Sequence, residues 1–168
     1  MTSEDLRVAE ISMKAGCATI LALNKWDISE TDIDDARARV ARKSRLRPAV
    51  ITVSAQRGRN VPSLLPRALE LADRAGQRIP TSELNRFVSA VVAKTPPPAR
   101  RGRRLKLLYT AQVGERPMRF AIQVNDRKLI NRDWAYHLEN RMRENYELEG
   151  VPLIIDFVPR TGYRGRQD

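Results

Sequence analysis

The strongest constraint on the fold of this chain is the run CATILAL at residues 17–23, which is short, apolar and without polar alternation. A strand of this kind is typical of a parallel sheet that is covered on both faces. A second β-branched run, PAVITVSA, follows at 48–55, and segments of helical periodicity lie at 2–16, 31–45 and 60–77. The order helix, strand, helix, strand, helix predicts an α/β fold with a parallel sheet.

A different order of elements is predicted after the segment RIPTSEL at residues 78–84. The patterns there predict a helix at 82–93, strands at 105–113 and 118–124 joined by the turn GERP, a long amphipathic helix at 131–148 and a last strand at 151–158, with an extra turn at DRKLI. Tyr109, Phe120 and Trp134 lie within the apolar patterns and are predicted core residues. We therefore predict two domains, 1–79 and 80–160, and a flexible tail at 161–168.

The charge of the chain favours a polyanionic partner. The 168 residues carry 31 Lys and Arg against 20 Asp and Glu, a net charge of +11. Residues 81–168 hold 17 of the bases and 10 of the acids, a net charge of +7. Nucleic acid is the first expectation and an anionic membrane surface the second. A basic surface that serves only solubility is the alternative, which charge alone does not exclude.

Composition also bounds the compartment and the metal chemistry. The single cysteine, Cys17, suits a reducing compartment, so a cytoplasmic location is expected. One cysteine and one histidine do not make a zinc site of the usual kind, and no metal site is predicted in this chain. No segment approaches the ~18 continuous apolar residues of a membrane span, so no membrane partner is expected.

The first apolar run ends on Asn24, Lys25, Trp26 and Asp27, a pattern that suits recognition of guanine. Guanine presents an N1–H and an exocyclic amine side by side, and one carboxylate accepts both bonds. Adenine lacks this pair of donors, so the carboxylate would be left unpaired. We predict that Asp27 binds the guanine edge, that Lys25 lies along the purine face and that Asn24 ties the loop to its neighbours. The alternative is that Asp27 only caps a turn and Lys25 is solvated.

A second signal follows the next strand. The run at 48–55 ends on Ser54 and Ala55, which resembles the Ser-Ala turn of GTPases. The resemblance implies that a backbone N–H at this turn meets the guanine carbonyl oxygen. Both signals then fall at the carboxyl ends of parallel strands, where open α/β sheets bind ligands.

The phosphate-binding half of a nucleotide site is missing from the sequence. A phosphate loop needs G-x-x-x-x-G-K-[ST], and no Gly-Lys dipeptide occurs in the chain. The only D-x-x-G sequence that resembles a switch motif, Asp73 to Gly76, lies at the end of a predicted helix and is interpreted as a helix stop. No catalytic residue is predicted, and the chain is expected to be inactive in GTP hydrolysis by itself.

Five segments together resemble one family, the bacterial tandem-G-domain GTPases called Der or EngA: SEDLRVAEISMKAG, LALNKWDI, ITVSAQRGRNV, LYTAQVGERPMRFAIQVND and YHLENRMRENYELEGVPLII. The resemblance implies that residues 1–79 are the back half of the second G domain, a partial Ras-like parallel sheet left from a P-loop NTPase. It implies an α+β KH-like domain for the rest. Asn24, Lys25 and Asp27 take guanine-binding roles with Ser54 and Ala55, and Trp26 holds the variable position.

The resemblance also implies partners. These are GTP or GDP, with Mg in the complete protein and no binding expected for this chain alone, the remaining G domains, and the large ribosomal subunit or its rRNA during assembly. The segment NDRKLINRDW lacks the Gly-x-x-Gly loop with which KH domains clamp RNA. RNA contacts are therefore predicted in the basic loop, at Arg100, Arg101, Arg103, Arg104 and Lys106. A merely solubilising loop is the alternative.

Two further expectations concern the chain as a whole. As a C-terminal piece of a GTPase that begins inside a G domain, it would expose one edge of the strand at 17–23, and self-association through that edge is predicted. The alternative function is a stand-alone KH-like adaptor that binds rRNA or a ribosomal protein without nucleotide.

Overall fold

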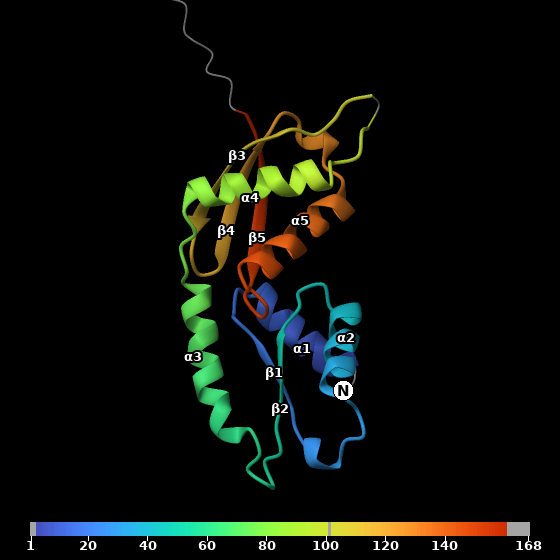
Figure 1. The fold of residues 1–168 in the computed structure, drawn as a ribbon, viewed down its shortest axis with the longest axis vertical. Helices are drawn as coiled ribbons and strands as arrows, with labels where there is room; N and C mark the ends of the chain where they lie inside the picture. Colours follow the sequence, from blue (N-terminus) through green and yellow to red (C-terminus); the bar gives the residue numbers. More distant parts are fainter. Residues whose placement is uncertain (1–2, 101, 161–168) are drawn as a thin grey trace, which may run out of the picture.

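The computed structural model describes residues 3–100 and 102–160, so the predicted tail at 161–168 and Arg101 lie outside the described residues. The molecule is elongated, with the elements of residues 3–75 at one end and those of residues 81–159 at the other (Figure 1). The elements of the first half are α1 (Ser3–Lys14), β1 (Ile20–Leu23), η1 (Trp26–Ile28), α2 (Ile33–Lys43), β2 (Ala49–Thr52), η2 (Val61–Ser63) and α3 (Leu64–Ala75). No helix in the described ranges has the length and apolarity needed to cross a bilayer.

The first half is the predicted parallel α/β unit. β1 and β2 pair in parallel, with Ile20 opposite Ala49 and Leu23 opposite Thr52, and α2 makes the crossover between them. α3 lies on the opposite side of the two strands from α1 and α2 (Figure 1). Asp32 begins α2, because its carboxylate accepts the N–H of Asp34 at 2.7 Å. The C-terminal residues of the strands therefore meet at one edge of the sheet.

β1 is less covered than its apolar sequence predicts. Ala22 is exposed and the other three residues of the strand are only half-buried. Within residues 3–100 and 102–160, β2 is the only strand that pairs with β1, so its second edge carries no ladder. β1 is less covered than predicted because the sheet has two strands, so β1 is an edge strand. The core of this half is correspondingly small, built on Leu6, Val40 and Val50.

The second half has the predicted order α-β-β-α-β. Its elements are α4 (Thr81–Lys94), β3 (Leu107–Gly114), β4 (Met118–Val124), η3 (Arg127–Leu129), α5 (Arg132–Asn145) and β5 (Leu153–Pro159). The strand order is β3-β4-β5, antiparallel between β3 and β4 and parallel between β4 and β5. α4 and α5 lie over the same side of this sheet (Figure 1), and η3 is the extra turn expected at DRKLI.

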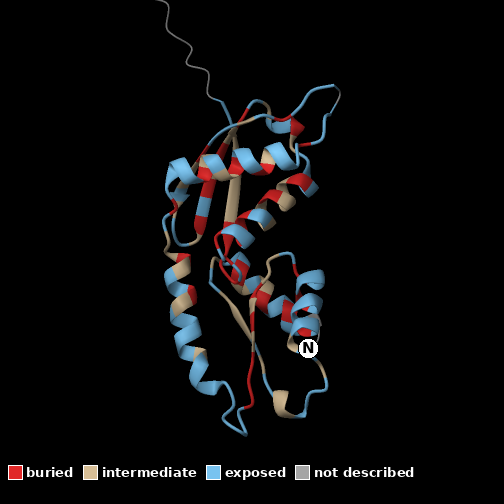
Figure 2. Cartoon of the chain, in the orientation of Figure 1, coloured by how far each residue is buried: buried red, intermediate tan, exposed pale blue. Residues whose placement is uncertain are grey.

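The core of the second half is large and reaches across the predicted domain boundary. Phe120, Ile122, Leu138 and Met142 are fully buried in it. Three residues from the end of α3 and the following segment belong to the same cluster: Leu71, Ala75 and Ile79. Buried positions gather in this half and where the two halves meet, whereas most of α3 is exposed (Figure 2). The end of α3 thus packs with the second half.

The prediction that Tyr109 is a core residue is wrong. Phe120 and Trp134 are buried as expected, but Tyr109 is 47% exposed. The pairing of β3 with β4 shifts register between Leu107 and Tyr109. An extra residue at this irregularity reverses the alternation of side chains, so Tyr109 faces outward while Thr110 is buried.

One glycine of the second half joins the two halves through its backbone. The Thr19 N–H donates to the Gly150 carbonyl at 2.8 Å, and the Gly150 N–H donates to the Arg47 carbonyl at 2.9 Å. Gly150 has φ +80°, and a Cβ there would lie 2.8 Å from both Ala49 Cβ and the Thr19 carbonyl oxygen. Only glycine fits this conformation and this contact without strain. The loop between α5 and β5 therefore extends the hydrogen bonding at the starts of β1 and β2.

A buried arginine holds this loop from the inside. Arg143 is 3% exposed, and its Nη1 donates to the carbonyls of Leu148 at 3.1 Å and Val151 at 2.6 Å. Its charge is balanced by Glu139, which lies 2.8 Å from Nη2. A buried cation needs such partners because desolvation without them is costly. Arg143 thereby fixes the loop that carries Gly150.

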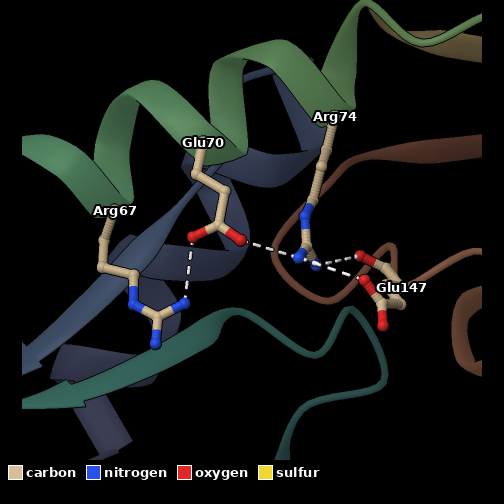
Figure 3. A network of polar contacts seen from close by, with 4 residues as sticks. All are labelled: Arg67, Glu70, Arg74 and Glu147. Carbon is tan, nitrogen blue, oxygen red and sulfur yellow. Dashed lines mark hydrogen bonds and ion pairs between the residues drawn. The ribbon is translucent and has the colours of Figure 1, made fainter.

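The same loop is tied to α3 by a chain of charges (Figure 3). Glu70 lies between Arg67, at 2.9 Å, and Arg74, at 2.7 Å. Arg74 also donates to the Glu147 carbonyl at 2.9 Å and lies 3.1 Å from the Glu147 carboxylate. Figure 3 shows Arg74 reaching from α3 to the α5–β5 loop. The two halves are thus connected on both sides of the parallel sheet.

Candidate guanine-binding loops and basic surfaces

The two sequence-predicted loops lie side by side because their strands are parallel neighbours. Asn24 follows β1 directly, and Ser54 follows β2 after a single residue. The Trp26 N–H donates to the Val53 carbonyl at 3.1 Å, which ties the first loop to the second strand. The six predicted residues Asn24, Lys25, Trp26, Asp27, Ser54 and Ala55 therefore form one cluster at the carboxyl edge of the sheet.

Asn24 connects the two loops through its side chain. Its Oδ1 accepts the N–H of Lys25 at 2.8 Å and the N–H of Ala55 at 3.1 Å. The Ala55 N–H, which belongs to the turn where a backbone N–H is predicted to meet the guanine carbonyl oxygen, thus has a protein acceptor in this structure. Lys25 is exposed and has φ 60°, a left-handed conformation that is uncommon for lysine. The loop is shaped by bonds and not by apolar burial.

Asp27 has the environment of a carboxylate that stays charged. Its side chain is 8% exposed and lies 3.3 Å from Nε of Arg57. The fully buried hydroxyl of Ser54 is the largest cause of a lowered pKa at Asp27. Burial of Asp27 acts in the opposite direction and raises the pKa, whereas the charge of Arg57 lowers it further. Ser54 Oγ also accepts the Arg57 N–H at 3.2 Å. The carboxylate is therefore an ionised acceptor at neutral pH.

Arg57 was not predicted from the sequence, although it forms an ion pair with the central residue of the candidate site. A guanidinium presents neighbouring N–H donors, as the guanine edge does, so Arg57 is matched to the same carboxylate. Its side chain is 70% exposed and free to move aside. The signal that points to it is its place three residues after Ser54, inside the turn that carries the second loop.

The predicted RNA-binding loop is folded against the end of the second sheet. Arg100 and Arg103 are joined by mutual backbone bonds of 2.8 and 3.1 Å, and Gly102 has φ +72°. Arg103 pairs with Asp126 at 3.3 Å, and Arg100 donates to the Lys128 carbonyl at 3.2 Å. The side chains of Arg104 and Lys106 are exposed, and Arg101 lies outside the described residues. Part of the positive charge of this loop is therefore neutralised.

A second basic run was missed as a binding surface. Residues 37–47, RARVARKSRLR, contain six basic residues. Basic residues at the end of α2 are also expected because they complement the helix dipole. Lys43, the last residue of α2, and Arg45, which follows the helix, line a cleft with residues of α5 and β5. The density of basic residues in the sequence indicates a candidate binding surface. The position of these residues beside α5 follows only from the docking of the two halves.

The fold and these loops define a class of protein in which a parallel α/β unit with Asn-Lys-x-Asp and Ser-Ala loops is followed by a small KH-like domain. Residues 78–157 match the family model described as the KH-domain-like, C-terminal domain of EngA bacterial GTPase enzymes. The second half is therefore a KH-like domain of the EngA type.

Relatives of the whole chain carry the name GTPase Der. The chain is 37% identical over 166 residues to GTPase Der of Symbiobacterium thermophilum, covering 95% of this chain and 35% of the relative. It is 36% identical over 165 residues to that of Desulforudis audaxviator, covering 95% and 38%, and 36% identical over 166 residues to that of Chloroflexus aggregans, covering 95% and 37%. The chain is thus homologous to a part of GTPase Der and spans little more than a third of the length of these relatives.

Proposed function

We propose that this chain is the C-terminal portion of a cytoplasmic guanine-nucleotide-binding protein that acts in assembly of the large ribosomal subunit. Residues 1–79 contribute guanine recognition from the back of a G domain, and residues 80–160 form the KH-like domain. The observation that carries the proposal is the cluster in which Asn24 joins the two loops and the Ser54 hydroxyl bonds to the Asp27 carboxylate. An ionised, largely buried carboxylate with a replaceable two-donor partner is what guanine requires.

The remaining part of a G domain is the partner that the first half suits best. The second edge of β1 has unpaired backbone groups in the described structure. Large apolar side chains are exposed on α1 and α3, which lie on the two sides of the sheet: Val8, Ile11, Leu65 and Leu69. Exposed apolar groups beside a free strand edge are typical of a surface that another chain segment covers. A phosphate loop and the ligands of Mg would come from that segment.

Base selectivity is tested in a chimera in which the front of the Symbiobacterium thermophilum G domain precedes residue 3. We expect it to bind fluorescent GDP and to discriminate against the ADP analogue. Asp27→Asn is expected to weaken GDP binding by about 100-fold or more and to strengthen binding of XDP, because xanthine replaces the amine by a carbonyl that an amide N–H can bond. Asp35→Asn, an exposed change of equal charge on α2, is the control.

The test of guanine recognition compares the binding of GDP with the binding of XDP. A chimera that binds GDP equally well before and after Asp27→Asn, with XDP unchanged, would contradict guanine recognition by this cluster. For the chain by itself we expect no saturable binding of fluorescent GDP up to high micromolar concentration, because nothing in its sequence replaces the phosphate loop.

A second candidate function is a KH-like adaptor that needs no nucleotide. The observation in its favour is that the second half has its own large core and carries the +7 share of the charge. Sedimentation of the chain with large ribosomal subunits, in the presence and absence of GDP, separates the two functions. The adaptor would be favoured if this chain bound the subunits equally well with and without GDP and if the chimera did not discriminate between GDP and the ADP analogue.

A further inference from the structure

We propose that the cleft between the two halves binds single-stranded RNA. The cleft has a volume of about 630 Å³ and is lined by residues of α1, of the α2–β2 connection, of α5 and of β5. Its walls combine cations with aromatic rings, the two kinds of group with which proteins hold single strands. The inference rests on the nucleic-acid side of the proposed function and names the surface that carries it.

The positive charge of this cleft is available to a ligand. Four cations line it: Lys14, Lys43, Arg45 and Arg132. Two carboxylates also line it, but Glu10 pairs with Lys14 at 3.9 Å and Glu139 pairs with the buried Arg143 at 2.8 Å. Within the described ranges, no carboxylate lies within ion-pair distance of Lys43, Arg45 or Arg132. Three cations in one cleft are therefore left to bind phosphate.

The aromatic part of the cleft is arranged for stacking. The guanidinium carbon of Arg45 lies 5.2 Å from the centroid of the Tyr136 ring, and Arg45 is exposed. A guanidinium plane supported by an aromatic ring is a surface on which an unpaired base stacks. Phe157, half-buried on β5, adds a second ring to the wall. Stacking on one base and charge on neighbouring phosphates together favour a single strand over a duplex.

The cleft exists only when the two halves are docked. Lys43 and Arg45 come from the first half, and Arg132, Tyr136 and Phe157 come from the second. The Gly150 bonds and the contact between Arg47 and Glu144, at 3.8 Å, hold the walls together. The chain's own C-terminal residues 160–168 carry three arginines and one aspartate, so charge disfavours them as an occupant of this cleft.

The test is fluorescence anisotropy of the intact chain with a labelled uridine decamer, titrated at several salt concentrations. Lys43→Ala/Arg45→Ala is expected to weaken binding about tenfold and to reduce the slope of log affinity against log salt by about 1.4, at ~0.7 per phosphate contact. The matched control is Arg86→Ala/Lys94→Ala, which removes equal charge from two exposed positions of α4 and is expected to change affinity less than twofold.

The aromatic component is tested separately. Tyr136→Ala is expected to weaken binding about tenfold with the salt slope unchanged, because it removes stacking support and no charge. Tyr136→Phe keeps the ring and is expected to bind as the unsubstituted chain does. Because Tyr136 is only half-buried, circular dichroism of both variants verifies that each is folded. A duplex of ten base pairs is expected to bind more weakly than the single strand.

Several results would overturn the proposal: no binding of the decamer at low salt, equal losses for the two double variants, or a poly-glutamate peptide that binds as tightly as RNA and competes for the cleft. The last result would assign the cleft to an acidic protein segment. None of these variants touches Asp27 or Ser54, so the guanine test in the chimera succeeds or fails independently.

Discussion

The two halves of this chain differ in how completely each buries its own sheet. In the second half the central strand β4 has a neighbour on both sides, and four of its seven residues are buried, at Met118, Phe120, Ile122 and Val124. In the first half β1 has one neighbour and no buried residue. The difference teaches that the KH-like half buries its own sheet, whereas the first half leaves β1 open to contacts from outside its own elements.

The largest expected effect comes from breaking the support inside the second half. Arg143→Ala should lower the free energy of unfolding by about 3–5 kcal/mol, because Glu139 and two loop carbonyls lose their buried partner. Arg141→Ala on the same helix is the control, since its pair with Glu144 is about half exposed and such pairs contribute less than about 1 kcal/mol. Urea unfolding followed by circular dichroism measures both. Equal losses would show that burial of Arg143 is unimportant.

A smaller effect is expected from disturbing the junction between the halves. Gly150→Ala should cost about 1–2 kcal/mol for the left-handed backbone and a further 1–3 kcal/mol for the contact of its Cβ with Ala49 and Thr19. Gly102→Ala has a similar φ with open space around it, so only the first cost applies. Thermal unfolding should therefore rank Gly150→Ala well below Gly102→Ala. Identical midpoints would mean that the junction does not need a glycine.

The next prediction concerns alkaline pH and the second half alone. Burial, with a smaller contribution from the charge of Glu83, raises the pKa of Tyr146 to about 12. Since the pKa is raised in the folded state, the stability due to neutral Tyr146 is complete below pH 10 and is lost as pH rises toward 12. Tyr146→Phe should remove this loss. At neutral pH it should change stability by less than about 1 kcal/mol, because the hydroxyl has no partner within the described residues.

Absorbance of tyrosinate against pH gives the value directly. The component of the titration that Tyr146→Phe removes should have its midpoint near pH 12. If the substituted and unsubstituted chains show the same titration near pH 12, the burial of Tyr146 is not felt in solution.

The smallest effect on stability is expected at the free edge of β1, where association changes instead. Ala22→Lys places a charge on an exposed residue of this edge and should reduce self-association with a stability change within about 0.5 kcal/mol. Ser89→Lys on the exposed face of α4 is the control. Sedimentation velocity over a range of concentrations measures the difference. Association that is unaffected by Ala22→Lys would place the contact elsewhere.

Local patterns predicted much of this molecule. The parallel pair β1–β2, the hairpin β3–β4, the extra turn η3 and the helix stop at Gly76 all follow from periodicity and turn residues near in sequence. The adjacency of the Asn24 and Ser54 loops also follows, because parallel strands align their carboxyl ends. These features need only the order of elements.

Features that depend on tertiary contact were not predictable. The outward turn of Tyr109 depends on a register shift in the β3–β4 ladder, which apolar periodicity does not reveal. The pair of Arg57 with Asp27 joins two loops thirty residues apart. The cleft at Arg45 and Tyr136 brings together residues from both halves, so it follows only from the way the halves are docked.

Hydrogen exchange, measured by NMR on the dilute chain, compares the two halves most directly. Thr19 and Leu23 carbonyls accept bonds from β2, so the backbone groups of Ile20 and Ala22 point to the free edge. We predict that the amides of Ile20 and Ala22 exchange within minutes, whereas those of Phe120 and Ile122 exchange only with global unfolding. Protection of Ile20 and Ala22 equal to that of β4 would contradict the account, because it would mean that the first half is as complete as the second.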